Sequence, residues 1–273
     1  MDILQSILYG IVSGLAEFLP ISSTGHQGML KVFFGVEAMP LLDIFVHSGL
    51  LLAVIISSAT YIERLKRQLR ITGNKKRPIN ADRILGYEIR LIRSAMIPML
   101  LAMVVFSIIG GGNFGLLGLA VLFAINGVII YFPEHLPQGN KDAMLMSKAD
   151  GILIGVFGAL SVFPGISRIG ASSSYAVARG ADKTKVVNWM LALSIPALLL
   201  SIVLDIVALF VYGVGSFSVS ILFGYILSAA FAFGAGIFGI SIIRMITARS
   251  SFSSLGYYSW GAALLAFILY LSA

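Results

Sequence analysis

The chain of 273 residues contains no cysteine, so it has no disulfide bond, no thiolate metal site and no cysteine nucleophile. Charge is also scarce, because Asp, Glu, Lys and Arg together make up 11% of the residues. Hydrophobic residues make up 58%, and the mean hydropathy is +0.97. This balance excludes a soluble domain with a large core and predicts an all-α, polytopic membrane protein.

The first residues, MDILQ, lack the basic start and the small-residue cleavage site of a signal peptide. We therefore expect the first hydrophobic segment to be retained within a single integral membrane domain, residues 1–273. Glycine, in contrast, is abundant at 29 residues, and small residues let membrane helices approach one another closely.

Positive charge is concentrated in one segment. Ten of the nineteen Lys and Arg residues lie between Arg64 and Arg93, and this segment separates two apolar stretches. The positive-inside rule makes it a cytoplasmic loop. The net charge of +7 then requires no nucleic-acid partner, and the attraction of the loop to anionic membrane lipids is a by-product.

The stretch from Ser13 to His26, SGLAEFLPISSTGH, does not fit an ordinary transmembrane helix. Glu17 would cost about 3 kcal/mol at the middle of a bilayer unless it faced water or protein. Pro20 breaks the helix, and the backbone groups that it frees need partners that lipid does not provide. An acid, the three hydroxyls of residues 22–24 and an imidazole on a broken helix therefore predict a polar site at membrane depth.

Two apolar segments are interrupted in this way, Ile3 to Phe34 at Pro20 and Asp150 to Ala178 at Pro164-Gly165. Their halves are too short to cross a hydrocarbon core of roughly 30 Å, so we expect two re-entrant hairpins. One kinked span is the alternative for the first. Six uninterrupted stretches are expected to be transmembrane helices: Leu41 to Ile62, Ser94 to Ile109, Phe114 to Phe132, Val186 to Tyr212, Phe217 to Ile243 and Leu255 to Ser272.

A polar linker from Pro133 to Lys148 divides the chain into two halves, each with one interrupted segment and three spans. If the basic loop is cytoplasmic, the two spans that follow it, joined by an expected glycine turn at residues 110–113, cross the membrane outward and back. The linker is then cytoplasmic as well. The second hairpin then enters from the side opposite to the first. The sequence thus predicts inverted repeats, residues 1–132 and 149–273, whose broken tips meet near the membrane midplane.

The strings EFLPISSTGH (residues 17–26) and FPGISRIGAS (residues 163–172) lie one in each half, with Asp43 and His47 between them. Together they resemble the bacterial undecaprenyl pyrophosphate phosphatase family, also called the bacitracin-resistance family. The resemblance implies a multi-pass enzyme of the bacterial inner membrane that converts a C55 isoprenoid diphosphate to the monophosphate. This reaction recycles the lipid carrier for cell-wall glycan synthesis and confers bacitracin resistance. The resemblance also implies a divalent cation, Mg²⁺ or Ca²⁺, and leaves room for a homodimer.

The residue types suit a diphosphate substrate. An arginine can hold two phosphate oxygens as a fork, and the N-termini of the broken helices can direct backbone amides at the same oxygens. The sequence leaves open whether water, Ser23 or His26 attacks, and whether Glu17 or His26 is the base. The expected roles are catalysis by Glu17, Ser23 and His26, diphosphate binding by Arg168, Ser167, Ser22 and Thr24, support by Asp43, His47 and Ser172, and metal binding by Glu17.

The same residues could instead have purely structural roles. Glu17 could form an ion pair with Arg168 that locks the two halves, and His26 could lie at the membrane interface. Residues 22–24 could simply cap a half-helix, and Asp43 and His47, which share a helix face, could be a satisfied pair near the membrane surface. Asp205, alone in a long apolar span, is not explained by the sequence.

The chain departs from the family pattern at three positions. Ser13 stands where the family has a second acid one turn before the motif glutamate, Ile169 where it has a serine, and Gly158 where it has a glutamine. Loss of the acid weakens a cation site, because hard cations need several oxygen ligands. The alternative function is therefore a carrier that moves a prenyl phosphate without cleaving it. Survival of Glu17, Ser23 and His26 favours the phosphatase, since binding alone does not require them.

Overall fold

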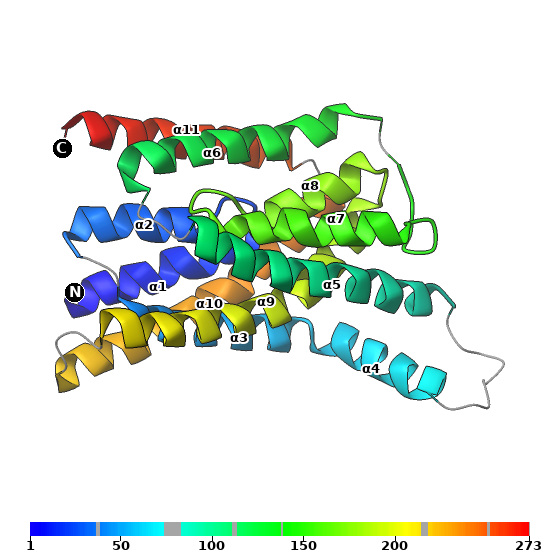
Figure 1. Ribbon diagram of the computed structural model, residues 1–273, viewed down its shortest axis with the longest axis horizontal. Coiled ribbons are helices and arrows are strands. Elements are labelled where there is room, and N and C mark those ends of the chain that lie inside the picture. The colour runs from blue at the N-terminus through cyan, green and yellow to red at the C-terminus, as the bar shows by residue number, and fades with distance from the viewer. Residues whose placement is uncertain are drawn as a thin grey trace.

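The computed structural model describes residues 1–36, 39–73, 83–110, 114–137, 139–213, 218–249 and 252–272, which are largely helical and contain no strand (Figure 1). Residues 111–113 of the expected glycine turn and residues 74–82 of the basic loop lie outside this part. The elements are α1 (Ile3–Phe18), α2 (Ser23–Phe34), α3 (Pro40–Ser57), α4 (Ala59–Gly73), α5 (Arg83–Gly110), α6 (Gly115–Tyr131), η1 (Phe132–His135), α7 (Lys148–Ala159), η2 (Leu160–Val162), α8 (Arg168–Ala178), α9 (Lys183–Tyr212), α10 (Val219–Arg249) and α11 (Ser253–Ser272).

Within the described residues, five helices are long and apolar enough to cross a membrane: α3, α5, α9, α10 and α11. The chain is therefore a polytopic, all-helical membrane protein. The stretch expected as a sixth span forms α6, which is apolar but has 17 residues, or about 26 Å at 1.5 Å per residue.

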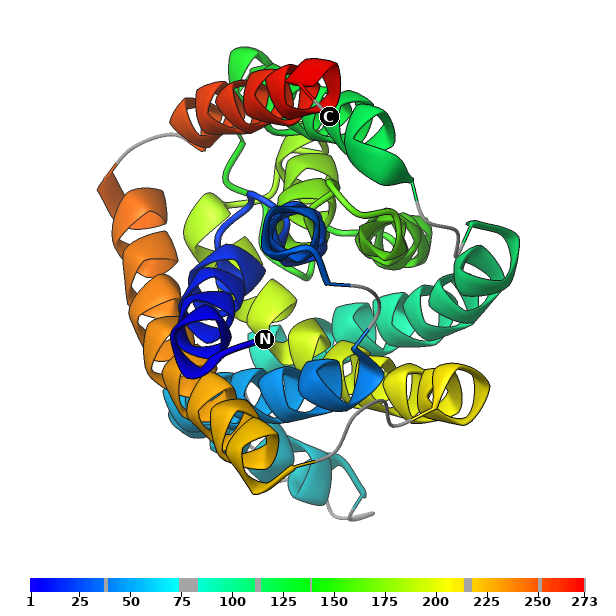
Figure 2. The ribbon, with the colours of Figure 1, turned by 90° about the vertical axis from the view of Figure 1, so that its left-hand side faces the viewer.

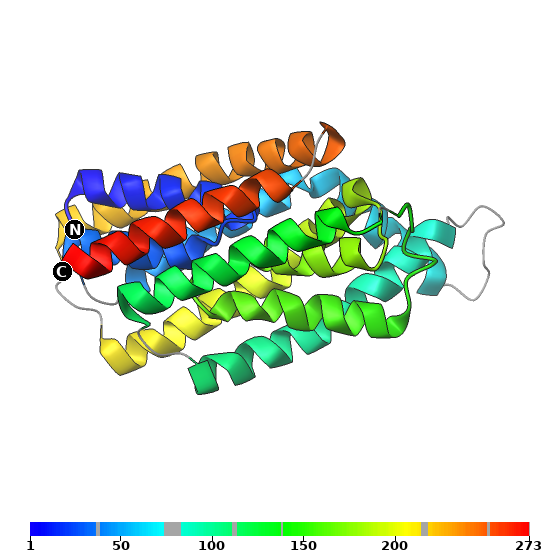
Figure 3. The ribbon, with the colours of Figure 1, turned by 90° about the horizontal axis from the view of Figure 1, so that it is seen from above.

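Two helix pairs, α1 with α2 and α7 with α8, are hairpins in which the chain reverses direction. The first reaches in from the end of the bundle that carries both termini, and the second from the opposite end (Figures 1 and 3). Seen end-on, these pairs lie inside the arrangement of longer helices (Figure 2). The first interrupted segment is thus a hairpin in this fold and not one kinked helix, and the tips of the two hairpins meet in the interior.

The span expected from Leu41 to Ile62 begins where expected but ends earlier. Helix α3 ends at Ser57, Ser58 leaves the helical path with φ −107° and ψ 8°, and α4 begins at Ala59. The reason is charge: α4 carries the first basic residues of the loop, which are stabilised outside the hydrocarbon. Conversely, α5 already begins at Arg83, well before the expected start at Ser94, because the last part of the basic segment is helical.

Helix α1 packs closely on α10 through glycine. A Cβ added at Gly10 would lie 2.2 Å from the carbonyl oxygen of Ser228, and one at Gly14 would lie 2.6 Å from that of Ala232. The abundant glycines therefore do bring membrane helices into backbone contact.

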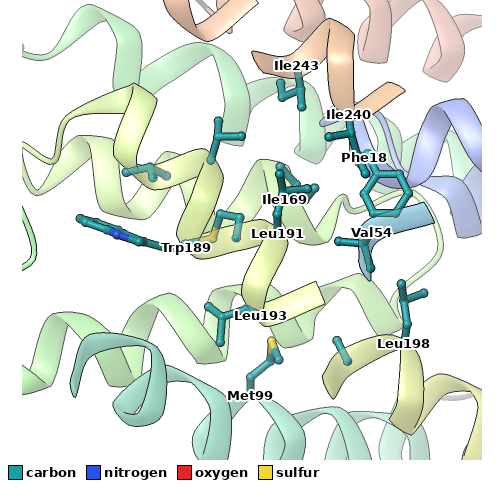
Figure 4. Close-up of a cluster of buried hydrophobic side chains, with 14 of the residues drawn as sticks. Phe18, Val54, Met99, Ile169, Trp189, Leu191, Leu193, Leu198, Ile240 and Ile243 are labelled. Carbon is teal, nitrogen blue, oxygen red and sulfur yellow. The ribbon is translucent and has the colours of Figure 1, made fainter. Parts of the chain in front are cut away.

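A cluster of buried apolar side chains supports the hairpin tips (Figure 4). Phe18 and Ile169 belong to it and are 0% and 2% exposed. They directly follow the two charged residues of the motifs, Glu17 and Arg168, in the sequence. Packing of the core thus fixes the backbone from which both charged side chains project.

Candidate functional site

Hydrogen bonds from Ser22 and Thr24 join the two tips. Ser22 caps α2: its Oγ accepts from the amide of Gly25 at 3.2 Å and also from the amide of Gly165, in the other hairpin, at 3.0 Å. Its backbone lies in the left-handed region at φ 69°, which is costly for a residue with a Cβ. The hydroxyl of Thr24 reaches the carbonyl oxygen of Ser161 at 3.5 Å. The expected capping by this serine run is therefore correct, and it also links the halves.

Two glycines permit this contact. A Cβ at Gly25 would lie 2.8 Å from the Cα of Gly165, so the tips touch through backbone atoms. Gly165 itself has φ 115°, a conformation that side chains with a Cβ rarely adopt. Glycine in the PGIS sequence at the second break therefore allows the backbone to pack directly against the tip of the first hairpin.

Asn126 on α6 is fully buried and holds the tips from the side. Its amide nitrogen donates to the carbonyl oxygen of Pro20 at 3.2 Å and to Ser259 at 3.0 Å, and its oxygen accepts from the amide of Ser167 at 2.9 Å. The hydroxyl of Ser167 in turn caps α8 by accepting from Gly170 at 3.1 Å. Asn126 is not among the residues predicted from the sequence, although a side chain with both donors and acceptors in an otherwise apolar segment is a signal for such a role.

Glu17, Ser23 and Arg168 form one cluster where the tips meet. Ser23 Oγ donates a short hydrogen bond to Glu17 Oε2, and Arg168 Nη1 lies 3.3 Å from Glu17 Oε1. The side chains of Glu17 and Arg168 are 6% and 10% exposed. The ion pair considered as a structural link between the halves is present. The carboxylate also accepts a hydrogen bond from the Ser23 hydroxyl, which a purely structural ion pair does not require.

The guanidinium of Arg168 is only partly satisfied. Its Nε donates to Ser161 Oγ at a long 3.4 Å, and the buried Nη1 makes no hydrogen bond within the described residues. The pairing of Nη1 with Glu17 at 3.3 Å is thus an electrostatic contact and not a well-aligned hydrogen bond, and a buried guanidinium with unused donor capacity favours a further anionic partner. Both carboxylate oxygens of Glu17, in contrast, have a partner, since Oε2 accepts from Ser23 and Oε1 pairs with Arg168.

Two helix N-termini add to the positive potential. Helices α2 and α8 begin at Ser23 and Arg168, and their first amides, those of residues 23, 24, 168 and 169, find no acceptor in the described part of the chain. Free amides and the positive ends of two helix dipoles favour an anion at this point. Together with the Arg168 guanidinium, they make this part of the cluster suited to an anion.

His26 is close to this cluster in sequence but is held away from it. Its Nδ1 donates to the carbonyl oxygen of Ser22 at 2.7 Å, and its Nε2 lies 2.9 Å from the hydroxyl of Tyr258 on α11, whose ring stacks on the imidazole. Phe123 packs edge-on against the same ring. Both ring nitrogens are therefore occupied, and no signal in the sequence pointed to Tyr258.

The donors around Glu17 do not suit a divalent cation held by the protein. Ser13, in place of the second acid, accepts from Gln27 Nε2 at 3.0 Å and is fully buried. Glu17 already neutralises Arg168, and the described residues contain no group of three or more His, Asp or Glu side chains placed to hold a metal. A hard cation needs several oxygen ligands, and this cluster offers it one carboxylate beside a positive charge.

Asp43 and His47 lie in a neighbouring network. Asp43 accepts from Tyr9 at 2.6 Å and pairs with Lys31 at 2.8 Å, while His47 Nδ1 pairs with Asp205 at 2.6 Å. This explains the isolated acid in α9. In the described structure, Asp43 and His47 make no hydrogen bond or ion pair with the cluster at the tips. Ser172, the third residue expected to support the site, donates to the carbonyl oxygen of Ile154 at 3.0 Å and so links α8 to α7.

Comparison with known proteins identifies the family of the chain. The family model described as Bacitracin resistance protein BacA matches residues 6–265. A protein from Bacillus cereus named Undecaprenyl-diphosphatase 3 is 30% identical over 270 residues, with 98% of each chain covered. A protein named Undecaprenyl-diphosphatase from Methanobrevibacter smithii is 29% identical, with 98% of each chain covered. One of the same name from Treponema denticola is 33% identical, with 76% of each chain covered. The chain therefore belongs to the bacitracin resistance protein BacA family.

Proposed function

We propose that this protein hydrolyses undecaprenyl diphosphate, a C55 isoprenoid diphosphate, to the monophosphate in the bacterial inner membrane. The observation that carries the proposal is the partly satisfied guanidinium of Arg168, buried beside a serine hydroxyl that donates to Glu17. Membership of the family and the names of its relatives point to the same reaction. The product is the lipid carrier for cell-wall glycans, and its recycling accounts for resistance to bacitracin.

The terminal phosphate binds at the meeting point of the tips. Arg168 takes two of its oxygens as a fork, and the free amides of α2 and α8 bind the remaining ones. Ser22, Thr24 and Ser167 hold these amides in place through their caps and cross-links. Binding replaces Glu17 as the anionic partner of Arg168 and leaves the carboxylate free to take a proton.

Ser23 is the nucleophile in this proposal. Its Oγ attacks the terminal phosphorus and forms an O–P bond, while the bond from phosphorus to the bridging oxygen breaks and the isoprenoid monophosphate leaves with the electron pair. The hydroxyl proton passes to Glu17. Water then attacks the phosphorus of the phosphoserine and the bond from Ser23 Oγ to phosphorus breaks. Glu17 returns the proton to Ser23 Oγ, and inorganic phosphate leaves with the oxygen and both protons of the water. Positioning and charge neutralisation supply most of the rate, and His26, fixed by Tyr258, positions the first turn of α2.

The direct test is phosphate release from C55 diphosphate by the purified protein in detergent, with and without a chelator. We expect release that depends on intact Glu17, Ser23 and Arg168. A protein that binds the C55 monophosphate tightly but never releases phosphate would contradict the hydrolytic function.

We propose that Ser13 removes the need for a cation held by the protein, so that activity persists in chelator. Replacing Ser13 by glutamate places two carboxylates one helical turn apart on α1. We expect Ser13→Glu to make activity dependent on added Mg²⁺ or Ca²⁺, with a loss in chelator that the metal restores. Ser13→Gln, which has the same size without the charge, is the control for crowding and should not respond to metal. A parent enzyme that chelator inactivates would contradict this role of Ser13.

We further propose that the chain crosses the membrane six times, with α6 as the short span, and that residues 1–132 and 149–273 are inverted repeats. The end of α4 and the start of α5, which flank the basic loop, lie with the linker at one end of the bundle, and both termini lie at the other (Figure 1), which supports this arrangement. Labelling of single cysteines is straightforward, since the chain has none of its own. We expect Gly73→Cys and Asn140→Cys to react from the cytoplasmic side and Gly112→Cys from the other. Opposite sides for the first two would contradict the repeat.

A further inference from the structure

A groove of about 600 Å³ lies between α4, α5 and α7, away from the hairpin tips. Three cations line one part of it, Arg90 and Arg93 from α5 and Lys148 from α7. Apolar side chains line the rest, among them Ile97 and Ile152. Its lining is therefore amphipathic, with positive charge and hydrocarbon surface in one continuous hollow.

The groove crosses the boundary between polar and apolar sequence on two neighbouring helices. On α5, Arg93 is the last charged residue, and none follows until after Phe132. On α7, Lys148 is the first helical residue, and the helix becomes apolar after Asp150. Where adjacent helices change character at the same level, that level is the membrane surface. The cations thus lie at headgroup depth and the apolar walls at acyl-chain depth.

The charges in the groove are available for a ligand. Arg93 and Lys148 are exposed and have no ion pair or hydrogen bond with the described residues. Arg90 donates to the carbonyl oxygen of Met146 at 3.2 Å and stacks 4.8 Å from the ring of Tyr87, which fixes its guanidinium. None of the described lining residues is acidic.

The two acids nearest in sequence are already engaged with other partners. Glu88 accepts from Tyr61 at 2.8 Å, and Asp150 pairs with Arg179 at 2.7 Å. The groove therefore keeps its positive charge, and a ligand that complements it must carry an anionic head and a hydrocarbon tail.

We propose that this groove binds an anionic glycerophospholipid of the surrounding membrane. The phosphate contacts Arg93 and Lys148, with Arg90 behind it, and one acyl chain lies against Ile97 and Ile152. A zwitterionic lipid is disfavoured because its own cation would meet three others. The site is separate from the cluster of Glu17 and Arg168 and does not depend on the proposed reaction.

The test is a titration of the purified protein with phosphatidylglycerol, followed by native mass spectrometry, with phosphatidylcholine of the same chains for comparison. We expect phosphatidylglycerol to bind more tightly. In the double variant Arg93→Gln and Lys148→Gln we expect affinity to fall roughly 25-fold, about fivefold for each juxtamembrane cation. The matched control is Lys66→Gln with Arg67→Gln, which removes the same charge from the exposed face of α4 outside the groove.

A second variant separates the groove from general attraction to a basic surface. Ile97→Trp adds bulk to the apolar wall without changing charge, and we expect it to weaken binding of phosphatidylglycerol while Lys66→Gln with Arg67→Gln does not. Equal losses in the two double variants, equal binding of both lipids, or displacement of bound phosphatidylglycerol by undecaprenyl phosphate at equal concentration would each overturn the proposal. Binding of phosphatidylglycerol should persist in Arg168→Lys, whose defect lies in the other site.

Discussion

Replacing Arg168 by lysine is expected to lower kcat/KM for phosphate release by about 10² to 10³-fold, the usual cost of losing an oriented donor to the transition state. The charge is retained, but an ammonium group is a point charge and does not present two aligned donors to phosphate oxygens. The lysine ammonium can still pair with the Glu17 carboxylate, so the helical fold should persist. Steady-state phosphate release in detergent measures the effect, and circular dichroism checks the fold.

Arg179→Lys is the matched control for this experiment. Arg179 is an exposed arginine at the end of α8 that pairs with Asp150 at 2.7 Å, on the same hairpin but away from the tip. We expect its substitution to change activity by less than about threefold, since lysine keeps the charge and the pair with Asp150 lies away from the tip. Near-normal turnover by Arg168→Lys would remove Arg168 from the phosphate site, whatever the control does.

Ser23→Ala and Glu17→Gln are expected to reduce turnover by about 10² to 10⁴-fold each, the range for loss of a positioned proton acceptor or the group it activates. Their effects should not add in the double variant, because the hydroxyl and the carboxylate act as one unit. Ser194→Ala is the control: this buried serine on α9 donates to the carbonyl oxygen of Met190 at 3.0 Å and has no hydrogen bond to the cluster among the described residues.

Trapping distinguishes Ser23 as nucleophile from attack by water. With substrate labelled in its terminal phosphate, acid quench should leave label on Ser23 in the parent and none in Ser23→Ala. Absence of labelled protein at early times in an active parent would leave Glu17 as the base for a water molecule and contradict the covalent step.

The charged parts of the site could be predicted from the sequence because charge at membrane depth is expensive. Glu17 and Arg168 stand alone in apolar segments, each beside a proline or glycine break, and the structure brings them within 3.3 Å. A charged side chain at that depth is seldom there for packing alone. The break positions were predictable for the same reason, since Pro20 and Pro164 cannot continue a helix whose backbone lipid would leave unsatisfied.

The neutral partners could not be predicted, because their roles depend on tertiary contacts. Tyr258 reaches His26 across 232 positions of sequence. An aromatic residue near the end of a membrane helix is common and carries no signal of its own. The pair of Asp205 with His47 likewise depends on the packing of α3 beside α9. The end of α3 at Ser57 is not predictable from hydropathy, because hydropathy alone does not locate a break between two helices.

The cross-links between the tips also determine when two particular amide protons can exchange with water. The amides of Gly165 and Ser167, in the second half of the chain, donate to Ser22 Oγ and Asn126 Oδ1, in the first half. Neither bond belongs to a helix, so local fraying of α8 does not release them. Exchange at these two positions therefore reports the separation of the two halves. In deuterated solvent, slow exchange that persists through catalytic turnover would mean that substrate enters and product leaves without the halves coming apart.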